Sequence, residues 1–421
     1  MIRPFLFACV VCTASVLVVA QQMTLREVQV LIDANHPSLK AYDYRVKALN
    51  RYADGAGALD PPRIGAGLFM APYYTSLWKS GTDGAGGMGS FMVSAEQMIT
   101  NPSKLSANRD YMRSMASEEA SMRGAVRNDL YGVAGSYYVD WQIVKRKLPV
   151  IRESEELLRY LLKSIEIRYR YGLDKLNSYY KAQAMQSEIQ SEIVMNEGQI
   201  LRDRAALNTL MNRNKHEVFD IDTAFTIKSY ESVRIDSSEV VSRRSDYKVL
   251  TERMNILSRK KHLEQTKQLP DLGVRYDHMF AFGAQPQQFT LMLMMTLPFA
   301  PWSASAYDAN ASAIDEEINE LGSRRDALVN DVSGNAVQLR VALESRIQQL
   351  KMYDASIIPS MRKNYETTFI AYEQNTGDLF VVLDALQNLK LSQIARLEIL
   401  QQILQLQVEY ETQMQLEGNG P

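Results

Sequence analysis

The chain has 421 residues, of which 46 % are hydrophobic, and its formal net charge at pH 7 is −2. The charges balance and no basic stripe is present, so nothing in the composition favours a nucleic-acid partner. Both cysteines, Cys9 and Cys12, lie within the first twenty residues, which excludes disulfides and thiol catalysis from the rest of the chain. The length alone is typical of two or three ordinary domains.

The first twenty residues have the layout of a secretory signal peptide. Arg3 provides a positive start, an apolar run begins at Phe5, and Val18 and Ala20 stand at positions −3 and −1 of a cleavage site. An uncleaved membrane anchor or lipid attachment is the alternative, but an apolar run of about 16 residues is short for a bilayer. We predict that residues 1–20 are a signal peptide and that the mature chain works beyond the cytoplasmic membrane.

Sequence landmarks recur along the chain at a nearly constant offset of about 205 to 210 residues, which indicates an internal repeat. The pairs are 36–42 with 244–250, Pro62 with Pro270, Pro149 with Pro359, and Gly172 with Gly377. We therefore predict a first structural repeat at 21–243 and a second at 244–421. Each is expected to contain a helix, two strands, a long helix, a turn and another helix.

Two β-hairpins are expected, one in each repeat, at about 62–99 and about 270–299. Apolar and polar residues alternate from Leu272 to Phe280 and again from Phe289 to Leu297, the period of two that indicates a strand. Each strand is expected to be about 10 residues long, enough to cross a bilayer at a tilt. A small soluble sheet is the alternative.

Long helical hairpins are expected after each strand pair, at about 103–212 and about 303–417, with a linker at 213–243 and a further helix at 244–267. A continuous helix over 103–171 would be about 100 Å long. Such helices are far longer than the roughly three to four turns of an average globular helix and must lie beside other helices. The leucine and isoleucine spacing in the last helix is typical of a coiled-coil-like seam.

Each long hairpin is expected to reverse at a glycine, Gly172 in the first and Gly377 in the second, because glycine favours the end of a helix. Asp174 and Asp378 follow at short distance and are expected to cap the returning helices. A flexible kink within one continuous helix is the alternative. The paired strands favour a reversal, since the returning helices must end near the start of the outgoing ones.

Four groups of residues resemble motifs of the TolC-type outer-membrane efflux channels, the outer membrane factors of tripartite efflux systems, in order along nearly the whole mature chain. They are Arg168, Tyr169 and Gly172 with 182–183; Tyr372, Gly377 and Asp378 with 382–385, which includes Asp384; 244–247; and 297–299. Each motif is weak alone, and the resemblance rests on their order and spacing.

The resemblance implies a mainly α fold with a small β part. Coiled-coil-like helical hairpins would form a periplasmic α-barrel, and the two β-hairpins would contribute to a trimeric 12-stranded transmembrane β-barrel without open edges. The segment 213–243 would be an equatorial linker. The implied function is a passive duct in the outer membrane of a Gram-negative bacterium, carrying drugs, metal ions or other small compounds. Its implied partners are a periplasmic adaptor, an inner-membrane pump of the RND type and outer-membrane lipid.

The resemblance also implies that Gly172, Asp174, Gly377 and Asp378 surround the periplasmic aperture. Charged ties between tip helices are expected in this family, but the second turn, 375–379, has no basic residue, so we do not transfer such a latch. Asp174 and Asp378 could instead form a ring of carboxylates that favours cations, with helix capping as the alternative role and Lys175 as an offsetting charge.

No catalytic, cofactor or metal site is predicted. The four histidines are scattered, and no spaced cluster of cysteine and histidine exists. The 20 methionines suggest contact with soft metal ions, for example at Met292 and Met294, but methionine also packs readily in apolar space. A periplasmic or surface coiled-coil scaffold and a methionine-based metal chaperone are the alternative functions.

Overall fold

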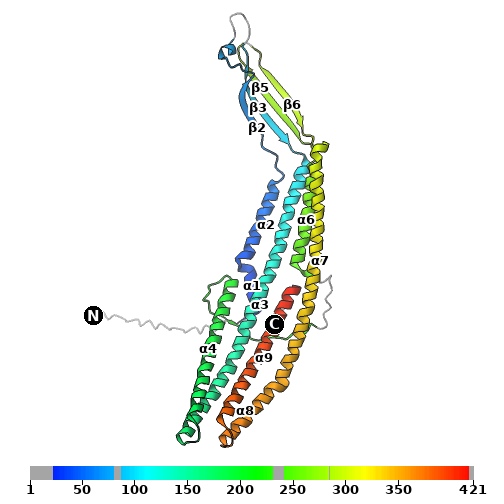
Figure 1. Cartoon of the computed structure of the whole chain (residues 1–421). Helices are drawn as coiled ribbons and strands as arrows, with labels where there is room; N and C mark the ends of the chain where they lie inside the picture. Colours follow the sequence, from blue (N-terminus) through cyan, green and yellow to red (C-terminus); the bar gives the residue numbers. More distant parts are fainter. Residues whose placement is uncertain (1–21, 80–86, 231–240, 284, 417–421) are drawn as a thin grey trace, which may run out of the picture.

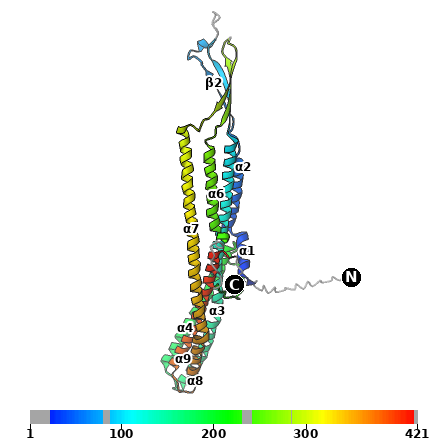
Figure 2. The same ribbon diagram turned by 90° about the vertical axis from the view of Figure 1, so that its right-hand side faces the viewer.

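The computed structural model describes residues 22–79, 87–230, 241–283 and 285–416. The molecule is long and narrow, with a small sheet at one end and two helical tips at the other (Figure 1). Figure 2 shows the helices running side by side along its length. The predicted signal peptide at 1–20 lies outside the described residues, as does part of the predicted linker.

The first half of the chain is dominated by α3, a helix of 69 residues. The helix was expected at 103–171, and both of its ends lie one residue earlier in the structure. Asn101 caps it by accepting a hydrogen bond from the Ser103 amide, and Pro149 lies inside it without ending it. The elements in order are β1 (Gln22–Met23), α1 (Leu25–Asn35), α2 (Pro37–Gly55), β2 (Arg63–Phe69), the 3-10 helix η1 (Thr75–Trp78), β3 (Ser90–Ile99), α3 (Pro102–Arg170), α4 (Leu176–Leu210) and β4 (Asp220–Ile221).

The second half follows the same order of helix, two strands and two long helical arms. Its outgoing arm is interrupted by a π-helical segment just before Pro359. The first half differs, because α3 continues through Pro149 without a break. Proline has no N–H for the carbonyl four residues earlier, and a widened turn accommodates that loss. The elements are α6 (Ser245–Thr266), β5 (Leu272–Ala281), β6 (Gln288–Met295), α7 (Pro301–Met352), η2 (Tyr353–Ile357), α8 (Ile358–Glu373) and α9 (Leu379–Met414).

The two β-hairpins join into one four-stranded antiparallel sheet in the order β2–β3–β5–β6. β3 and β5, from different halves of the chain, pair along their whole length, from Ser90 opposite Ala281 to Ile99 opposite Leu272. β2 and β6 have 7 and 8 residues and are shorter than expected. Both are edge strands of this sheet, so one side of each is unpaired among the residues that the structure describes.

The sheet has one apolar and one polar face. Most of the exposed large apolar side chains of the strands share one face by register, while Phe69 and Met292 lie on the other. Those on the shared face are Ile64, Leu68, Phe91, Ile99, Leu272, Val274, Tyr276, Phe280, Phe289, Leu291, Leu293 and Met295. On the other face Arg275 Nε lies 3.0 Å from Asp277 Oδ1. Met292 stands opposite Arg275 and Met294 opposite Gly273, so these methionines belong to the polar face.

A short segment that follows α4 lies across the middle of α3. β4 pairs in parallel with β1, and the Tyr138 hydroxyl donates to the carbonyl oxygens of Met23 and Asp222, both at 3.0 Å. Gln142 Nε2 donates to the carbonyl oxygens of Asp222 and Ala224. We call residues 219–225 the crossing segment. Tyr138 and Gln142 of α3 hold the crossing segment in place by donating hydrogen bonds to its backbone carbonyls.

Buried apolar residues form clusters along the helices. One cluster near the tips joins α3, α4, α8 and α9, and another joins α3, α7 and α9 higher up. Because these clusters extend along the helices, the two hairpins are held together over much of their length. Within the described ranges, none of the helices combines the length and the hydropathy needed to cross a bilayer.

Candidate functional site: the two helical tips

The turn between α3 and α4 is closed by a glycine in the left-handed conformation. Gly172 has φ of 73°, its N–H donates to the Tyr169 carbonyl, and the Leu173 N–H donates to the Arg168 carbonyl, both at 2.9 Å. This is the Schellman arrangement that ends many helices. A Cβ at Gly172 would meet nothing within 4 Å, so the position needs glycine for its conformation. The chain reverses here as the sequence predicts.

At the turn between α8 and α9 the left-handed residue is Asn375, with φ of 58°. Its N–H donates to the Tyr372 carbonyl at 3.0 Å. Gly377 provides space instead, because a Cβ there would lie 3.0 Å from the Tyr372 amide nitrogen. The predicted reversal at this turn is confirmed, since α8 ends at Glu373 and α9 begins at Leu379, but the expectation that Gly377 itself is the left-handed residue was wrong. Asparagine tolerates left-handed backbone better than most residues and fills that role.

The two aspartates of the tips have different roles. Asp378 is the N-cap of α9 and accepts a hydrogen bond from the Phe380 N–H at 2.7 Å, as predicted. The prediction that Asp174 caps α4 was wrong. Lys175 occupies the N-cap position, and its side chain makes no capping bond. Because the N-cap lies one residue after Asp174, the Asp174 carboxylate does not cap the helix and turns toward the other tip.

Four side chains, Arg168, Asp174, Tyr372 and Asn375, form what we call the tip cluster. Asp174 Oδ2 accepts from Arg168 Nε at 3.1 Å and from the Tyr372 hydroxyl at 2.7 Å. Arg168 Nη2 donates to Asn375 Oδ1, and the guanidinium carbon lies 4.5 Å from the centre of the Tyr372 ring. Two members come from the first turn region and two from the second, so the cluster ties the tips together.

Three members of the tip cluster are shielded from water, and only Asn375 is exposed. The side chains of Arg168 and Asp174 are only 17 % and 10 % exposed, and Tyr372 is 2 % exposed. Burial raises the pKa of Tyr372, and its hydrogen bond to Asp174 raises that pKa further, so the phenol stays protonated and donates. A hydrogen bond to a charged group typically contributes about 1.5–3 kcal/mol. The cluster therefore stabilises the arrangement in which the two tips touch.

Sequence reasoning named Arg168, Tyr372 and Asp174 but not their contact, and it missed Asn375. An asparagine just after a helical run is a weak signal for a left-handed cap that could have found it. The second turn has no basic residue, and the bonds that join the two turns each pair a charged group with a neutral one: Arg168 donates to Asn375, and Tyr372 donates to Asp174.

The remaining predicted tip residues lie outside the tip cluster. Tyr169 is exposed, and Asp384 accepts from Asn388 Nδ2 on its own helix at 3.0 Å. Over the ranges that the structure describes, no three side chains of histidine, cysteine, aspartate or glutamate are grouped to hold a metal ion.

The model of the family "Outer membrane efflux protein" matches residues 30–213. The matched range runs from α1 through the first β-hairpin and the first long helical hairpin, including Gly172 and its turn. Solved outer-membrane channels share the fold over more than nine-tenths of this chain, so the part outside the family match continues the same architecture. The chain therefore resembles this family in sequence over residues 30–213 and shares the fold of solved outer-membrane channels along nearly its whole length.

Solved structures similar to this chain include three from named bacteria. The CmeC outer membrane channel of Campylobacter jejuni aligns with a TM-score of 0.71 at 15 % identity, covering 93 % of this chain and 85 % of its own. VceC of Vibrio cholerae gives 0.69 at 15 %, covering 93 % and 95 %. The MtrE channel of Neisseria gonorrhoeae, in its open state, gives 0.68 at 12 %, covering 93 % and 89 %. No curated protein sequence matches significantly.

Proposed function

We propose that this protein is an outer-membrane efflux protein and the passive export duct of a tripartite efflux pump. The observation that carries the proposal is the four-stranded sheet, which has an exposed apolar face and two unpaired edges. Neighbouring strands are all antiparallel, so the edge strands β2 and β6 run in opposite directions. β6 of one copy can therefore continue the sheet antiparallel to β2 of the next.

A homotrimer closes this sheet. An open edge is not tolerated in lipid, because its N–H and C=O groups find no partner there. Three copies of the four-stranded sheet give twelve strands with no edge. The apolar face then contacts outer-membrane lipid, and the polar face, with Arg275 and Asp277, lines an aqueous interior. The sheet end lies in the outer membrane of a Gram-negative bacterium.

The helical arms extend the duct into the periplasm. With about 1.5 Å per residue, α3 spans about 100 Å. α4 and α9 run beside it, and α7 and α8 pack on α9 (Figures 1 and 2). The helices from three copies enclose a water-filled tube that transmits drugs, metal ions or other small compounds without chemical change.

The tips are the docking end for a periplasmic adaptor and, through it, an inner-membrane pump of the RND type. Large apolar side chains around the first turn are exposed there, namely Tyr169, Tyr171, Leu173 and Leu176. A cluster of exposed apolar side chains at the end of a soluble helical pair is typical of a protein interface.

The tip cluster is the device that holds the aperture narrow. Opening requires the first and second hairpins to separate at their tips, which breaks the bonds from Asp174 to Arg168 and Tyr372. Asp174 is engaged in this cluster and Asp378 caps a helix, so their principal role is to fix the tip and only secondarily to set the charge of the mouth.

Conductance of the purified full chain in planar bilayers tests the proposed function. We expect discrete channels, together with heat-resistant trimers in outer-membrane fractions. A protein that is soluble without detergent, monomeric and unable to conduct would instead be a scaffold, and the proposal would fail.

A further inference from the structure

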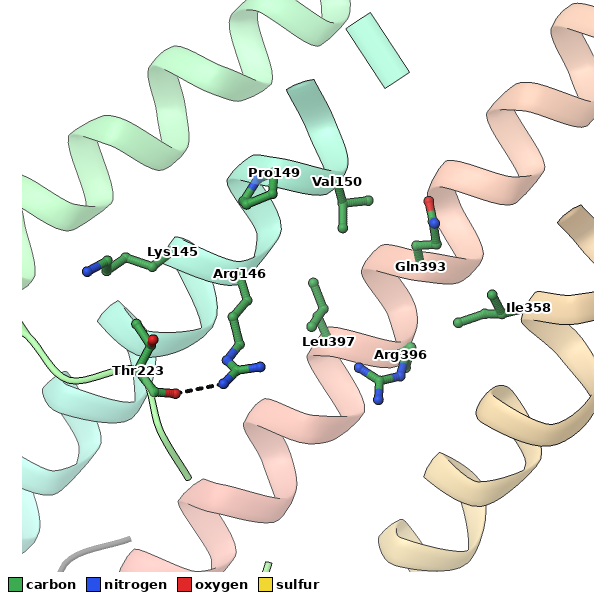
Figure 3. A pocket seen from close by; sticks show the side chains of 9 residues that line it. All are labelled: Lys145, Arg146, Pro149, Val150, Thr223, Ile358, Gln393, Arg396 and Leu397. Atoms are coloured by element: carbon green, nitrogen blue, oxygen red, sulfur yellow. Dashed lines mark hydrogen bonds between the residues drawn. The ribbon is translucent and has the colours of Figure 1, made fainter. Parts of the chain in front are cut away.

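A pocket of about 560 Å³ lies beside Pro149, far from the tip cluster. Figure 3 shows its walls, which come from α3, α8, α9 and the crossing segment. Its lining residues are Lys145, Arg146, Pro149, Val150, Thr223, Ile358, Gln393, Arg396 and Leu397. The lining combines apolar side chains with three cations, Lys145, Arg146 and Arg396. The three cations are the unusual feature.

Arg146 is a cation without a carboxylate partner among the described residues. Its Nη2 donates to the Thr223 carbonyl at 2.7 Å, and its guanidinium carbon lies 4.3 Å from the centre of the Phe225 ring. Its Nε is buried and has no hydrogen-bond partner. A buried donor left unpaired costs roughly 1–3 kcal/mol. The Arg146 side chain therefore has both charge and hydrogen-bonding capacity to spare.

The neighbouring cations are already paired. Lys145 Nζ lies 2.7 Å from Asp220 Oδ1, and Arg396 binds Asp354 through two nitrogens. Three cations thus line the pocket, and two of them are paired with carboxylates that lie outside its lining. Burial lowers the pKa of Arg146, and the positive charge of Arg396 lowers it further. The two guanidiniums repel each other, and an anion between them would relieve that repulsion.

We propose that this pocket binds a small organic oxyanion, a carboxylate or phosphate compound, with its charged group between Arg146 and Arg396. Figure 3 shows both side chains extending toward the same space, with Leu397 between their helices. Guanidiniums match carboxylate and phosphate oxygens in geometry. Val150, Ile358 and Leu397 provide an apolar wall for the rest of the ligand. The site is separate from the proposed gate. Binding of an anion there does not depend on transport through the duct.

The contacts of Arg146 with Thr223 and Phe225 could also serve only to anchor the crossing segment. That structural role predicts no affinity for anions and no contribution from Arg396, which donates to Asp354 and not to the crossing segment. The two roles are therefore distinguishable by measuring binding in two separate variants.

The test is calorimetric titration of the purified full chain in detergent with hexanoate and with inorganic phosphate, at constant ionic strength. We expect saturable binding of both, tighter for hexanoate because of the apolar wall. Arg146→Gln and Arg396→Gln should each weaken binding about tenfold or more, the effect of losing one charge-assisted contact. Arg159→Gln, which removes an exposed arginine of α3 paired with Glu155, is the control and should bind as the wild type does.

Three results would overturn the inference. The first is no saturable binding of either anion by the wild type. The second is unchanged affinity in both pocket variants. The third is loss in Arg146→Gln alone, because a site between two guanidiniums requires Arg396 as well. Helical content measured by circular dichroism confirms that each variant is folded before its affinity is compared.

Discussion

Tyr372→Phe is the most informative single change at the tips. The substitution keeps the ring that packs under the Arg168 guanidinium and removes only the hydroxyl that donates to Asp174 at 2.7 Å. The carboxylate keeps its bond to Arg168 Nε, so the tie between the tips is weakened and not abolished. We expect the closed tip to lose stability relative to the open one.

The expected magnitude follows from the chemistry of that bond. A hydrogen bond to a charged group is typically worth about 1.5–3 kcal/mol, and the remaining Arg168 contact favours the lower part of that range. A loss of 1.4 kcal/mol shifts an equilibrium about tenfold. The ratio of open to closed tips should therefore rise about tenfold or more per chain.

Single-channel recording in planar bilayers measures this ratio as the fraction of time spent in the higher-conductance state. Tyr169→Phe is the matched control, since it removes a hydroxyl from an exposed tyrosine outside the cluster and should leave the fraction unchanged. A double-mutant cycle with Asp174→Asn should be non-additive, because the two groups share one bond. If Tyr372→Phe conducts as the wild type does while its thermal stability shows a folded protein, the tip cluster is not the gate.

Three further predictions concern stability against denaturant, measured with the purified protein. Gly172→Ala should cost about 1 kcal/mol because φ is positive there, whereas Gly377→Ala should destabilise through contact with backbone atoms 3.0–3.1 Å away; no loss in either would contradict these readings of the turns. Asp378→Ala should cost about 1 kcal/mol as a lost N-cap, while Asp378→Asn, also a good cap, should be nearly neutral. Burial raises the pKa of Asp203 in α4 from 3.8 to about 6, so the folded state holds its proton more tightly. Stability should then fall by up to roughly 3 kcal/mol between about pH 4 and pH 6, and Asp203→Asn should remove that fall.

Much of the fold was predictable because its signals are local. The lengths of α3, β3 and β5 follow from residue spacing and from the positions of proline, and these act over a few neighbouring residues. The Asp378 cap was found for the same reason. The identical reasoning failed at Asp174, since one residue of offset between the left-handed position and the aspartate moved the N-cap to Lys175. The left-handed residue is Gly172 in one turn and Asn375 in the other. A local sequence pattern therefore cannot determine how many residues separate the left-handed position from the N-cap.

The sequence by itself determined the two long hairpins, the strand pairs with one apolar face, and the places where the chain reverses, because backbone preference and hydrophobic period are encoded within a few turns. Only the tertiary structure decided which side chains meet. Arg168 and Asp174 find Tyr372 and Asn375 some two hundred residues away, and Arg146 faces Arg396 across a pocket. Those contacts depend on the register of helix against helix, which is set by the packing of the buried clusters along their whole length.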